Sequence, residues 1–406
     1  MESETENPIR FDLLQRAAER ILADYHQHSV VIEHSTLLTQ PDNRNRIWRC
    51  QLRAAECVVP DLIVIKQVSP EGYDPSKPDA WDTVRFFRDW AGARFLSDFM
   101  PEDAHGPKFY GGNLELGFII LEDMGEHTSL VGPLLEGNAA SAREALMAYA
   151  SRLGRMHAAS IGKESMYREI QRGISPLWAE AEGKSQAVVL QAIEKKMAAF
   201  MENCASLGVL PGETAKQELA SALQRLEELG PFRTFIHSDP CPDNVFYRPP
   251  NLRLIDFEFA CFGHALQDGL YGRLPFPTCW CANAVPTEVV EKMENAYRLE
   301  LSVACPQATD DAIFFREAAM IAARSVAGSL QEDLEAALKQ DDTWGIAGMR
   351  GRILSRIAMF LDTARCANQM PALRDIYAKL LTELQSRWPD ATPLPVYPAF
   401  QALSTP

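Results

Sequence analysis

The segment that decides the fold reads Phe235-Ile-His-Ser-Asp239-Pro-Cys-Pro-Asp-Asn244-Val-Phe246, and it is followed shortly by Leu254-Ile-Asp256-Phe-Glu258. Phosphoryl transfer to an alcohol needs a carboxylate that accepts the hydroxyl proton. It also needs an amide oxygen and a second carboxylate that hold Mg²⁺ against the phosphate oxygens. We therefore expect Asp239 to be the catalytic base, and Asn244 and Asp256 to bind Mg²⁺ after a tight hairpin brings them together. The competing interpretation is that both aspartates only stabilise turns.

Upstream of this segment the sequence predicts a small antiparallel sheet. Runs rich in apolar and β-branched residues cover Ser29–Leu38, Arg46–Arg53 and Leu62–Val68, and two further strands end at Asp123. Apolar residues recur at helical spacing on either side of the first three strands, which predicts helices at Phe11–His26 and Trp81–Phe99.

Downstream of Glu122 the sequence is mainly helical. Apolar periodicity predicts helices over Ser141–His157, Ala187–Leu207, Glu213–Leu229, Thr287–Ser302, Asp311–Leu338, Ile346–Cys366 and Leu373–Arg387. The Pro-rich tail, Pro389–Pro406, is expected to lie outside any helix. We therefore expect an α+β fold of two lobes. Residues 1–122 form the smaller lobe with the sheet and an N-terminal helix, and residues 123–406 form a large helical lobe with the catalytic loop and the substrate pocket.

Composition narrows the class of protein. The net charge of −15 over 406 residues argues against a nucleic-acid-binding surface. The start of the chain is acidic and polar, unlike a signal peptide, and no apolar run is long enough to span a bilayer. The nine cysteines are scattered, which favours free thiols in a reducing compartment. We therefore expect a cytoplasmic protein without nucleic-acid or membrane partners, and its oligomeric state stays open.

Two motifs carry a resemblance to a known family. His237-Ser-Asp239-x-x-x-x-Asn244 and Ile255-Asp256-Phe-Glu258 resemble the catalytic and metal-binding motifs of the aminoglycoside/choline phosphotransferase family. The segments Ser151–Ala159 and Gly263–Asp268 are also similar to parts of that family. The resemblance implies a protein-kinase-like fold in which residues 1–122 bind the nucleotide. It further implies ATP or GTP as the donor, Mg²⁺ as the cofactor and a small alcohol as the acceptor.

The resemblance also assigns residues to the nucleotide. Lys66 would pair with the α- and β-phosphates. It lies alone among apolar residues, where a lone charge is costly, so it should have an acidic partner on the next helix. Asp89 is the expected partner, and Asp82, about two turns earlier, is the alternative. Leu121 to Met124, including Glu122 and Met124 as the assigned residues, would form the hinge whose backbone holds the purine.

The loop expected over the phosphates departs from the protein-kinase pattern, because no glycine occurs between Ser29 and Glu71. Asn43 or Asn45 could adopt left-handed backbone angles and let amides face a phosphate. We assign Asn45 to the nucleotide site on this basis. The alternative is that the segment is a polar hairpin turn.

Other residues have two interpretations each. Tyr271 and Trp280 could line an acceptor pocket near Asp239, or belong to the ordinary core. Arg350, Arg352 and Arg356 could recognise an anionic acceptor, but a solvated helix face is the preferred interpretation.

Glu258 is either an indirect metal or water ligand or an exposed carboxylate. His237 should brace its loop, and His157 should be a buried histidine with its hydrogen bonds satisfied.

The predicted activity is that of a small-molecule kinase, a phosphotransferase with an alcohol group as acceptor. Two alternatives stay open. One is an aminoglycoside-inactivating phosphotransferase, which the acidic chain would suit but the non-acidic C-terminal segment does not favour. The other is a catalytically silent nucleotide-binding scaffold, against which the presence of Lys66, Asp239, Asn244 and Asp256 argues.

Overall fold

The computed structural model describes residues 8–40, 43–54, 58–99, 103–126 and 128–401. The chain divides into two compact units that interleave in sequence. The first unit comprises residues 1–127, 165–182 and 253–260, and the second comprises residues 128–164, 183–252 and 261–406. The two lobes expected from the sequence, residues 1–122 and 123–406, stay a prediction.

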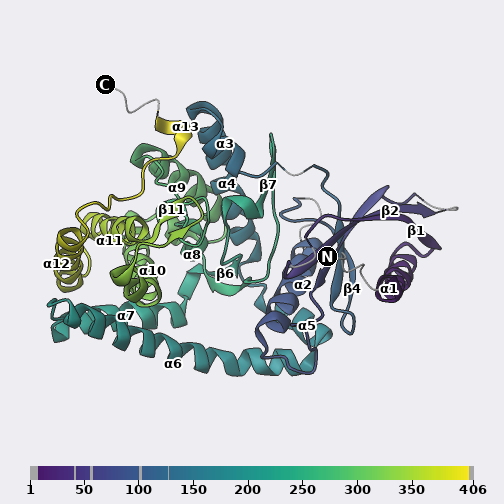
Figure 1. Ribbon diagram of the computed structural model, residues 1–406, viewed down its shortest axis with the longest axis horizontal. Helices are drawn as coiled ribbons and strands as arrows, with labels where there is room; N and C mark the ends of the chain where they lie inside the picture. Colours follow the sequence, from purple (N-terminus) through teal and green to yellow (C-terminus); the bar gives the residue numbers. More distant parts are fainter. Residues whose placement is uncertain (1–7, 41–42, 55–57, 100–102, 127, 402–406) are drawn as a thin grey trace, which may run out of the picture. The chain divides into compact units, whose positions relative to one another are not determined.

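The elements follow in the order strand-rich, then helix-rich (Figure 1). The helices are α1 (Pro8–His26), α2 (Trp81–Phe99), α3 (Val131–Leu135), α4 (Ala139–Ser160), α5 (Glu164–Ile174), α6 (Pro176–Ser206), α7 (Glu213–Glu228), α8 (Leu266–Gly269), α9 (Thr287–Leu301), α10 (Asp311–Lys339), α11 (Met349–Cys366), α12 (Pro371–Arg387) and α13 (Pro398–Gln401). The strands are β1 (Val30–Leu37), β2 (Asn45–Ala54), β3 (Leu62–Val68), β4 (Phe109–Asn113), β5 (Phe118–Glu122), β6 (Arg233–Ile236), β7 (Val245–Arg248), β8 (Asn251–Leu254), β9 (Cys261–His264), β10 (Thr343–Trp344) and β11 (Ala347–Gly348).

The first unit is built on a five-stranded antiparallel sheet in the order β1-β2-β3-β5-β4. Side chains alternate along β2, so that Trp48, Cys50 and Leu52 are buried on one face. Helix α1 covers this face and packs against β1 and β4 (Figure 1). The shared core contains Leu14, Ala18, Leu22, Ile32, Trp48, Ile63, Ile65 and Ile120. The sheet is thus anchored from one side by the N-terminal helix predicted from the sequence.

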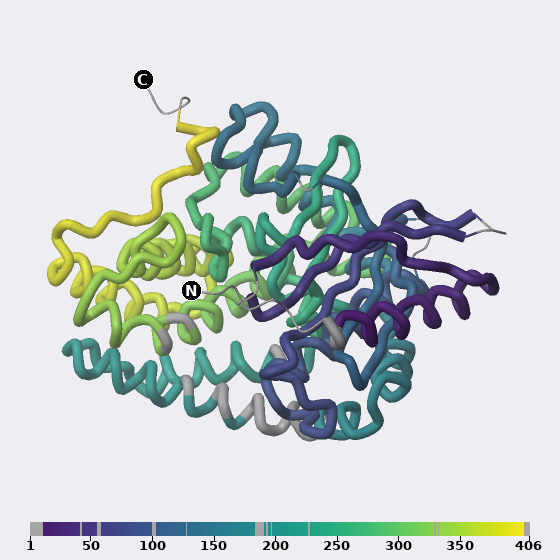
Figure 2. Tube along the Cα trace, turned by 45° about the vertical axis from the view of Figure 1, so that its right-hand side comes forward, coloured from purple at the N-terminus to yellow at the C-terminus, as the bar shows by residue number. Residues whose placement is uncertain are grey.

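The second unit is mainly helical. Helices α4 and α9 pack closely where α4 carries Gly154, since a Cβ at this position would lie 2.6 Å from the carbonyl oxygen of Tyr297. Helices α7, α10, α11 and α12 pack side by side, as Figures 1 and 2 both show. The short strands β6 and β9 pair with each other, and β6 leads directly into the segment that contains Asp239.

The α+β class, with a small antiparallel sheet and a mainly helical remainder, is confirmed. The helix prediction is wrong in several details. Helix α5 is absent from it, and α6 begins at Pro176 and not at Ala187. The Pro-rich tail contains α13, which begins at Pro398, because proline is tolerated in the first turn of a helix. Residue Ile346 is not helical, since β10 and β11 form a hairpin around it and α11 begins only at Met349.

Candidate functional site

The first unit contains a buried charge cluster around Lys66. This residue lies on β3, with its Nζ 2.8 Å from Asp89 Oδ2 on α2 and 2.6 Å from Asp256 Oδ1. Burial alone would lower the pKa of Lys66, but the carboxylates of Asp256 and Asp89 raise it above its usual value. Lys66 is therefore an ammonium held between two carboxylates. Asp82, the alternative partner, lies instead against Gly72.

The segment around Asp256 is fixed by its backbone. Asp256 has a φ of 66°, which is rare for a non-glycine residue and requires support from its surroundings. The next residue supplies that support, because the Phe257 N–H donates to Asp89 Oδ1 at 2.9 Å and the Phe257 ring is buried. Asp89 thus contacts both Lys66 and the backbone next to Asp256, which joins β3, α2 and this segment within the first unit.

Glu258 is not the exposed carboxylate that one interpretation predicted. Its side chain is buried and forms ion pairs with Arg44 and Arg85. The sequence pattern does not reveal this, because both arginines lie far from Glu258 along the chain. Two guanidinium groups neutralise the charge that makes an isolated buried carboxylate costly.

The residues assigned to the hinge and to the glycine-free loop also lie in the first unit. Glu122 ends β5, where its carboxylate pairs with Arg253 at 2.6 Å and accepts the Lys108 N–H. Met124 follows and is partly buried. Asn45 begins β2 and pairs with Val68, so the left-handed conformation considered for it is wrong. These contacts leave the nucleotide roles of Asn45, Glu122 and Met124 as predictions.

The second unit holds the loop of Asp239. Buried Asp268 accepts hydrogen bonds from the N–H groups of His237, at 2.6 Å, and Ser238, at 3.0 Å. Ser238 has a φ of 66°, and Tyr149 donates to the Pro240 carbonyl at 2.8 Å. Because these contacts fix the backbone on both sides of Asp239, the loop presents its carboxylate from a rigid position.

Asn244 lies beside Asp239, as its place in the motif predicts. Its Nδ2 donates to the Asp239 carbonyl at 3.0 Å and to Asp239 Oδ2 at 3.3 Å. These bonds engage the amide nitrogen, so the amide oxygen Oδ1 is the end of the side chain that could bind a cation. Asp256 belongs to the first unit and Asp239 and Asn244 to the second, so a single site containing all three stays a prediction.

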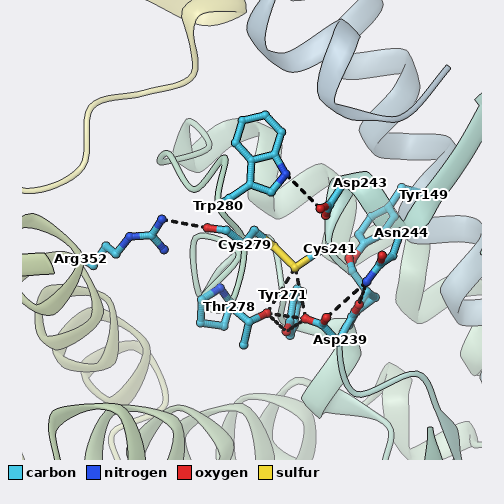
Figure 3. The surroundings of a disulfide bond; sticks show 12 residues. Tyr149, Asp239, Cys241, Asp243, Asn244, Tyr271, Thr278, Cys279, Trp280 and Arg352 are labelled. Atoms are coloured by element: carbon cyan, nitrogen blue, oxygen red, sulfur yellow. Dashed lines mark hydrogen bonds between the residues drawn. A yellow bond between two sulfur atoms is a disulfide. The ribbon is translucent and has the colours of Figure 1, made fainter. Parts of the chain in front are cut away.

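A disulfide joins Cys241 to Cys279 next to Asp239 (Figure 3). The expectation that the cysteines are free is therefore wrong for this pair, because the fold brings together two residues that are 38 positions apart. Six other cysteines in the described part of the chain are free: Cys50, Cys204, Cys261, Cys281, Cys305 and Cys366. The spacing of the cysteines does not predict this disulfide.

The segment that leads to Cys279 places two hydroxyl groups next to Asp239. Thr278 donates to Asp239 Oδ1 at 2.5 Å, and the hydroxyl of buried Tyr271 lies 3.2 Å from the same oxygen. Trp280 is partly exposed and donates through Nε1 to Asp243. The sequence analysis weighed Tyr271 and Trp280 as pocket or core aromatics, and it assigned no role to Thr278, whose separation from Asp239 carries no pattern.

Two arginines of α11 donate hydrogen bonds to the backbone of the segment that contains Thr278. Arg352 donates to the Cys279 carbonyl at 2.8 Å, and Arg356 donates to the Pro277 carbonyl. Both side chains are buried, so the solvated helix face preferred for them is wrong. Burial lowers the pKa of Arg352 to about 10, which leaves it charged at neutral pH. His157, by contrast, is buried and hydrogen-bonded to Tyr297 at 2.7 Å, as expected.

Comparison with known proteins gives the family. The model of the phosphotransferase enzyme family (APH) matches residues 83–293, just over half of the chain. No curated protein sequence matches significantly. In the part of the chain that the structure describes, no helix has both the length and the apolar character that crossing a membrane requires.

Several solved structures are similar over nearly the whole chain. A Plasmodium vivax ethanolamine kinase is 11% identical, with 93% of this chain and 97% of that chain covered and a TM-score of 0.46. A choline kinase from Cryptosporidium parvum Iowa II is 11% identical, with 93% and 99% covered and a TM-score of 0.44. An ADP-bound aminoglycoside phosphotransferase, APH(2'')-Ib, is 14% identical, with 91% and 99% covered and a TM-score of 0.47.

The family match confirms the resemblance carried by the motifs around Asp239 and Asp256, and with it the expected protein-kinase-like fold. The antiparallel sheet of the first unit, with α2 between β3 and β4, agrees with that fold. The chain belongs to the phosphotransferase enzyme family and is an enzyme that transfers a phosphoryl group to an alcohol group.

Proposed function

We propose that this phosphotransferase is a small-molecule kinase that uses Asp239 as its general base and Mg-ATP, or GTP, as its donor. The observation that carries the proposal is the contact between Asn244 and the Asp239 loop, at 3.0 and 3.3 Å, together with the donors that orient the carboxylate. The acceptor oxygen attacks the γ-phosphorus, and the bond between this phosphorus and the oxygen bridging it to the β-phosphate breaks. Asp239 takes the proton of the acceptor hydroxyl.

Lys66 is the proposed contact to the α- and β-phosphates. Its ammonium is already held by Asp89 at 2.8 Å, so a phosphate would add a further anionic partner without having to order a mobile side chain. Asp256 also bonds Lys66, at 2.6 Å, and its carboxylate is less buried than that of Asp89. The backbone from Glu122 to Met124 is the proposed contact for the purine, and Asn45 would lie toward the phosphates.

The donor set fits Mg²⁺. This ion prefers oxygen ligands and keeps waters and phosphate oxygens for the rest of its octahedral shell, so it needs few protein ligands. Asn244 offers its amide oxygen because its nitrogen is engaged by Asp239, and Asp256 offers a carboxylate. When bound, the ion would neutralise charge on the phosphate oxygens. The residues that would hold it are Asn244 and Asp256.

The experiment that tests the proposal is Asp239→Asn. The variant keeps the size of the side chain but loses its charge and basicity. A positioned general base contributes about 10²- to 10⁴-fold in rate, so turnover should fall by that factor while Mg-ATP affinity stays nearly unchanged. Asp375→Asn is the matched control, because Asp375 is exposed on α12 and pairs there with the exposed Lys379.

The acceptor for this experiment comes from a screen of the purified protein with labelled ATP against amino alcohols, sugars and aminoglycosides. Transfer to aminoglycosides alone would identify an antibiotic-inactivating enzyme. Binding of Mg-ATP without transfer to any compound would favour the silent scaffold. Wild-type turnover by Asp239→Asn would show that Asp239 is not the base.

A further inference from the structure

The loop Pro277–Trp280, called the capping loop here, brings an exposed threonine onto the proposed base. Thr278 Oγ1 lies 2.5 Å from Asp239 Oδ1 and 2.6 Å from the hydroxyl of Tyr271, which itself lies 3.2 Å from Asp239 Oδ1 (Figure 3). The three oxygens therefore form one cluster. A capping role for this loop does not follow from the family motifs, because the loop lies outside them.

Counting protons assigns the directions of these bonds. Each hydroxyl has a single proton to donate, and the carboxylate can only accept. The two shortest separations are satisfied together if Tyr271 donates to Thr278 and Thr278 donates to Asp239. Burial, together with the nearby charge of Asp239, raises the pKa of Tyr271 well above its usual value, so its hydroxyl stays protonated as this chain requires. Thr278 is thus the direct donor to Oδ1.

The bond fixes which carboxylate oxygen is available to the acceptor. Oδ1 is occupied by the short bond from Thr278, whereas the nearest partner of Oδ2 in the described structure is Asn244 Nδ2 at 3.3 Å. A carboxylate that is hydrogen-bonded through one oxygen cannot rotate freely about its χ2 angle. Oδ2 is therefore presented as the atom that receives a proton.

Hydrogen bonds to three of its carbonyl groups and a disulfide hold the capping loop in place. Arg352 donates to the carbonyl of Cys279 at 2.8 Å, Arg356 donates to that of Pro277, and the Ile346 N–H donates to that of Trp280 at 2.9 Å. The disulfide to Cys241 then links the loop to the Asp239 segment itself. Both cysteines are buried, so the link is shielded from solvent while the Thr278 side chain reaches the surface.

We propose that Thr278 is a positioning residue that holds Asp239 with Oδ2 toward the acceptor, and that the Cys241–Cys279 disulfide keeps it there. This inference rests on the proposed role of Asp239 as the base. The sulfur of Cys241 lies 3.2 Å from Asp239 Oδ1, and in the disulfide it has no proton to donate. Reduction by a dithiol converts the S–S bond to two thiols while the dithiol closes to its own disulfide. It thereby removes the covalent link between the capping loop and the Asp239 segment and adds a competing S–H donor at Oδ1.

The first test replaces the hydroxyl alone. Thr278→Val keeps the branched shape, and we expect kcat to fall about tenfold, as for loss of one hydrogen bond to a charged group, with KM for Mg-ATP within about twofold. Thr278→Ser restores the donor and should recover kcat to within about twofold of wild type. Equal losses in both variants, or a loss confined to KM, would overturn the positioning role.

The second test removes the disulfide. In the variant Cys241→Ala/Cys279→Ala we expect kcat to fall by a similar factor, and adding Thr278→Val should then cost little more, because both changes act on the same contact. If this variant folds poorly, wild-type protein reduced with dithiothreitol serves instead, with the thiols counted by maleimide labelling and mass spectrometry. Wild-type kcat without the disulfide would overturn its part in the proposal.

Asp239→Asn separates failure of this inference from failure of the proposed function. Turnover uses Mg-ATP and the most active acceptor from the screen. If Asp239→Asn is inactive and Thr278→Val behaves as wild type, only the positioning role fails. If Asp239→Asn is fully active, or the wild type transfers phosphate to no acceptor, the proposed function is wrong and the positioning role of Thr278 is wrong as well.

Discussion

The buried ammonium of Lys66 should be needed for stability before any nucleotide binds. In the first unit its side chain is 12% exposed and that of Asp89 only 6%, with 2.8 Å between Nζ and Oδ2. The change Lys66→Met keeps most of the side-chain volume but leaves Asp89 as a buried carboxylate without its cation. Removing one partner of a buried ion pair costs about 3–5 kcal/mol of unfolding free energy.

The structure indicates the lower end of that range. Asp89 keeps the N–H of Phe257 at 2.9 Å, and it can take up a proton when the lysine is gone. The side chain of Asp256 is 31% exposed, so water can replace part of its contact with Lys66. We therefore expect Lys66→Met to lower the free energy of unfolding by about 3 kcal/mol, a large part of the 5–15 kcal/mol typical of proteins.

Urea unfolding at pH 7, followed by tryptophan fluorescence, measures this loss. The double variant Lys66→Met/Asp89→Asn removes the unpaired charge of Asp89 but keeps an oxygen that accepts the Phe257 N–H. Its free energy of unfolding should therefore be about 1–2 kcal/mol higher than that of Lys66→Met. Lys77→Met is the matched control, because Lys77 forms an exposed pair with Asp74 at 3.1 Å and should change stability by less than about 1 kcal/mol. A loss no larger than in the control, or no recovery in the double variant, would refute the reasoning.

Two further predictions concern metal and pH. Asp256→Ala should abolish the rise in melting temperature that Mg-ATP gives the wild type, because a proposed oxygen ligand is lost, and chelation should do the same to the wild type. An unchanged rise in the variant would remove Asp256 from the site. In the second unit, burial alone would raise the pKa of Glu317, but the interactions with His264 and Arg225 outweigh it and lower the pKa to about 2. The stabilisation by Glu317 is therefore complete above its ordinary value of 4.5 and is lost as pH falls toward 2. The gap in melting temperature between wild type and Glu317→Gln should shrink below about pH 4.5, and a gap that grows there would contradict the assignment.

The family, the fold class and most of the elements can be predicted from the amino-acid sequence. Strand β3 and helix α2 begin and end where the apolar pattern predicts, because local periodicity reports which side chains face a core. The motif also places Asn244 next to Asp239, since a short loop leaves few ways to arrange two residues so close in sequence. These features depend on neighbours along the chain, and a single sequence contains that information.

The contacts between distant segments of the chain are visible only in the three-dimensional structure. Asp82 and Asp89 lie two turns apart on one helix, and only packing against β3 shows that Asp89 meets Lys66. The sequence favoured a solvated helix face for the arginines of α11, but it could not show that the capping loop accepts hydrogen bonds from Arg352 and Arg356. Thr278 and Cys279 reach Asp239 and Cys241 because the chain folds back across more than thirty residues. No local pattern encodes such a contact, since its free energy arises only when both segments are already in place.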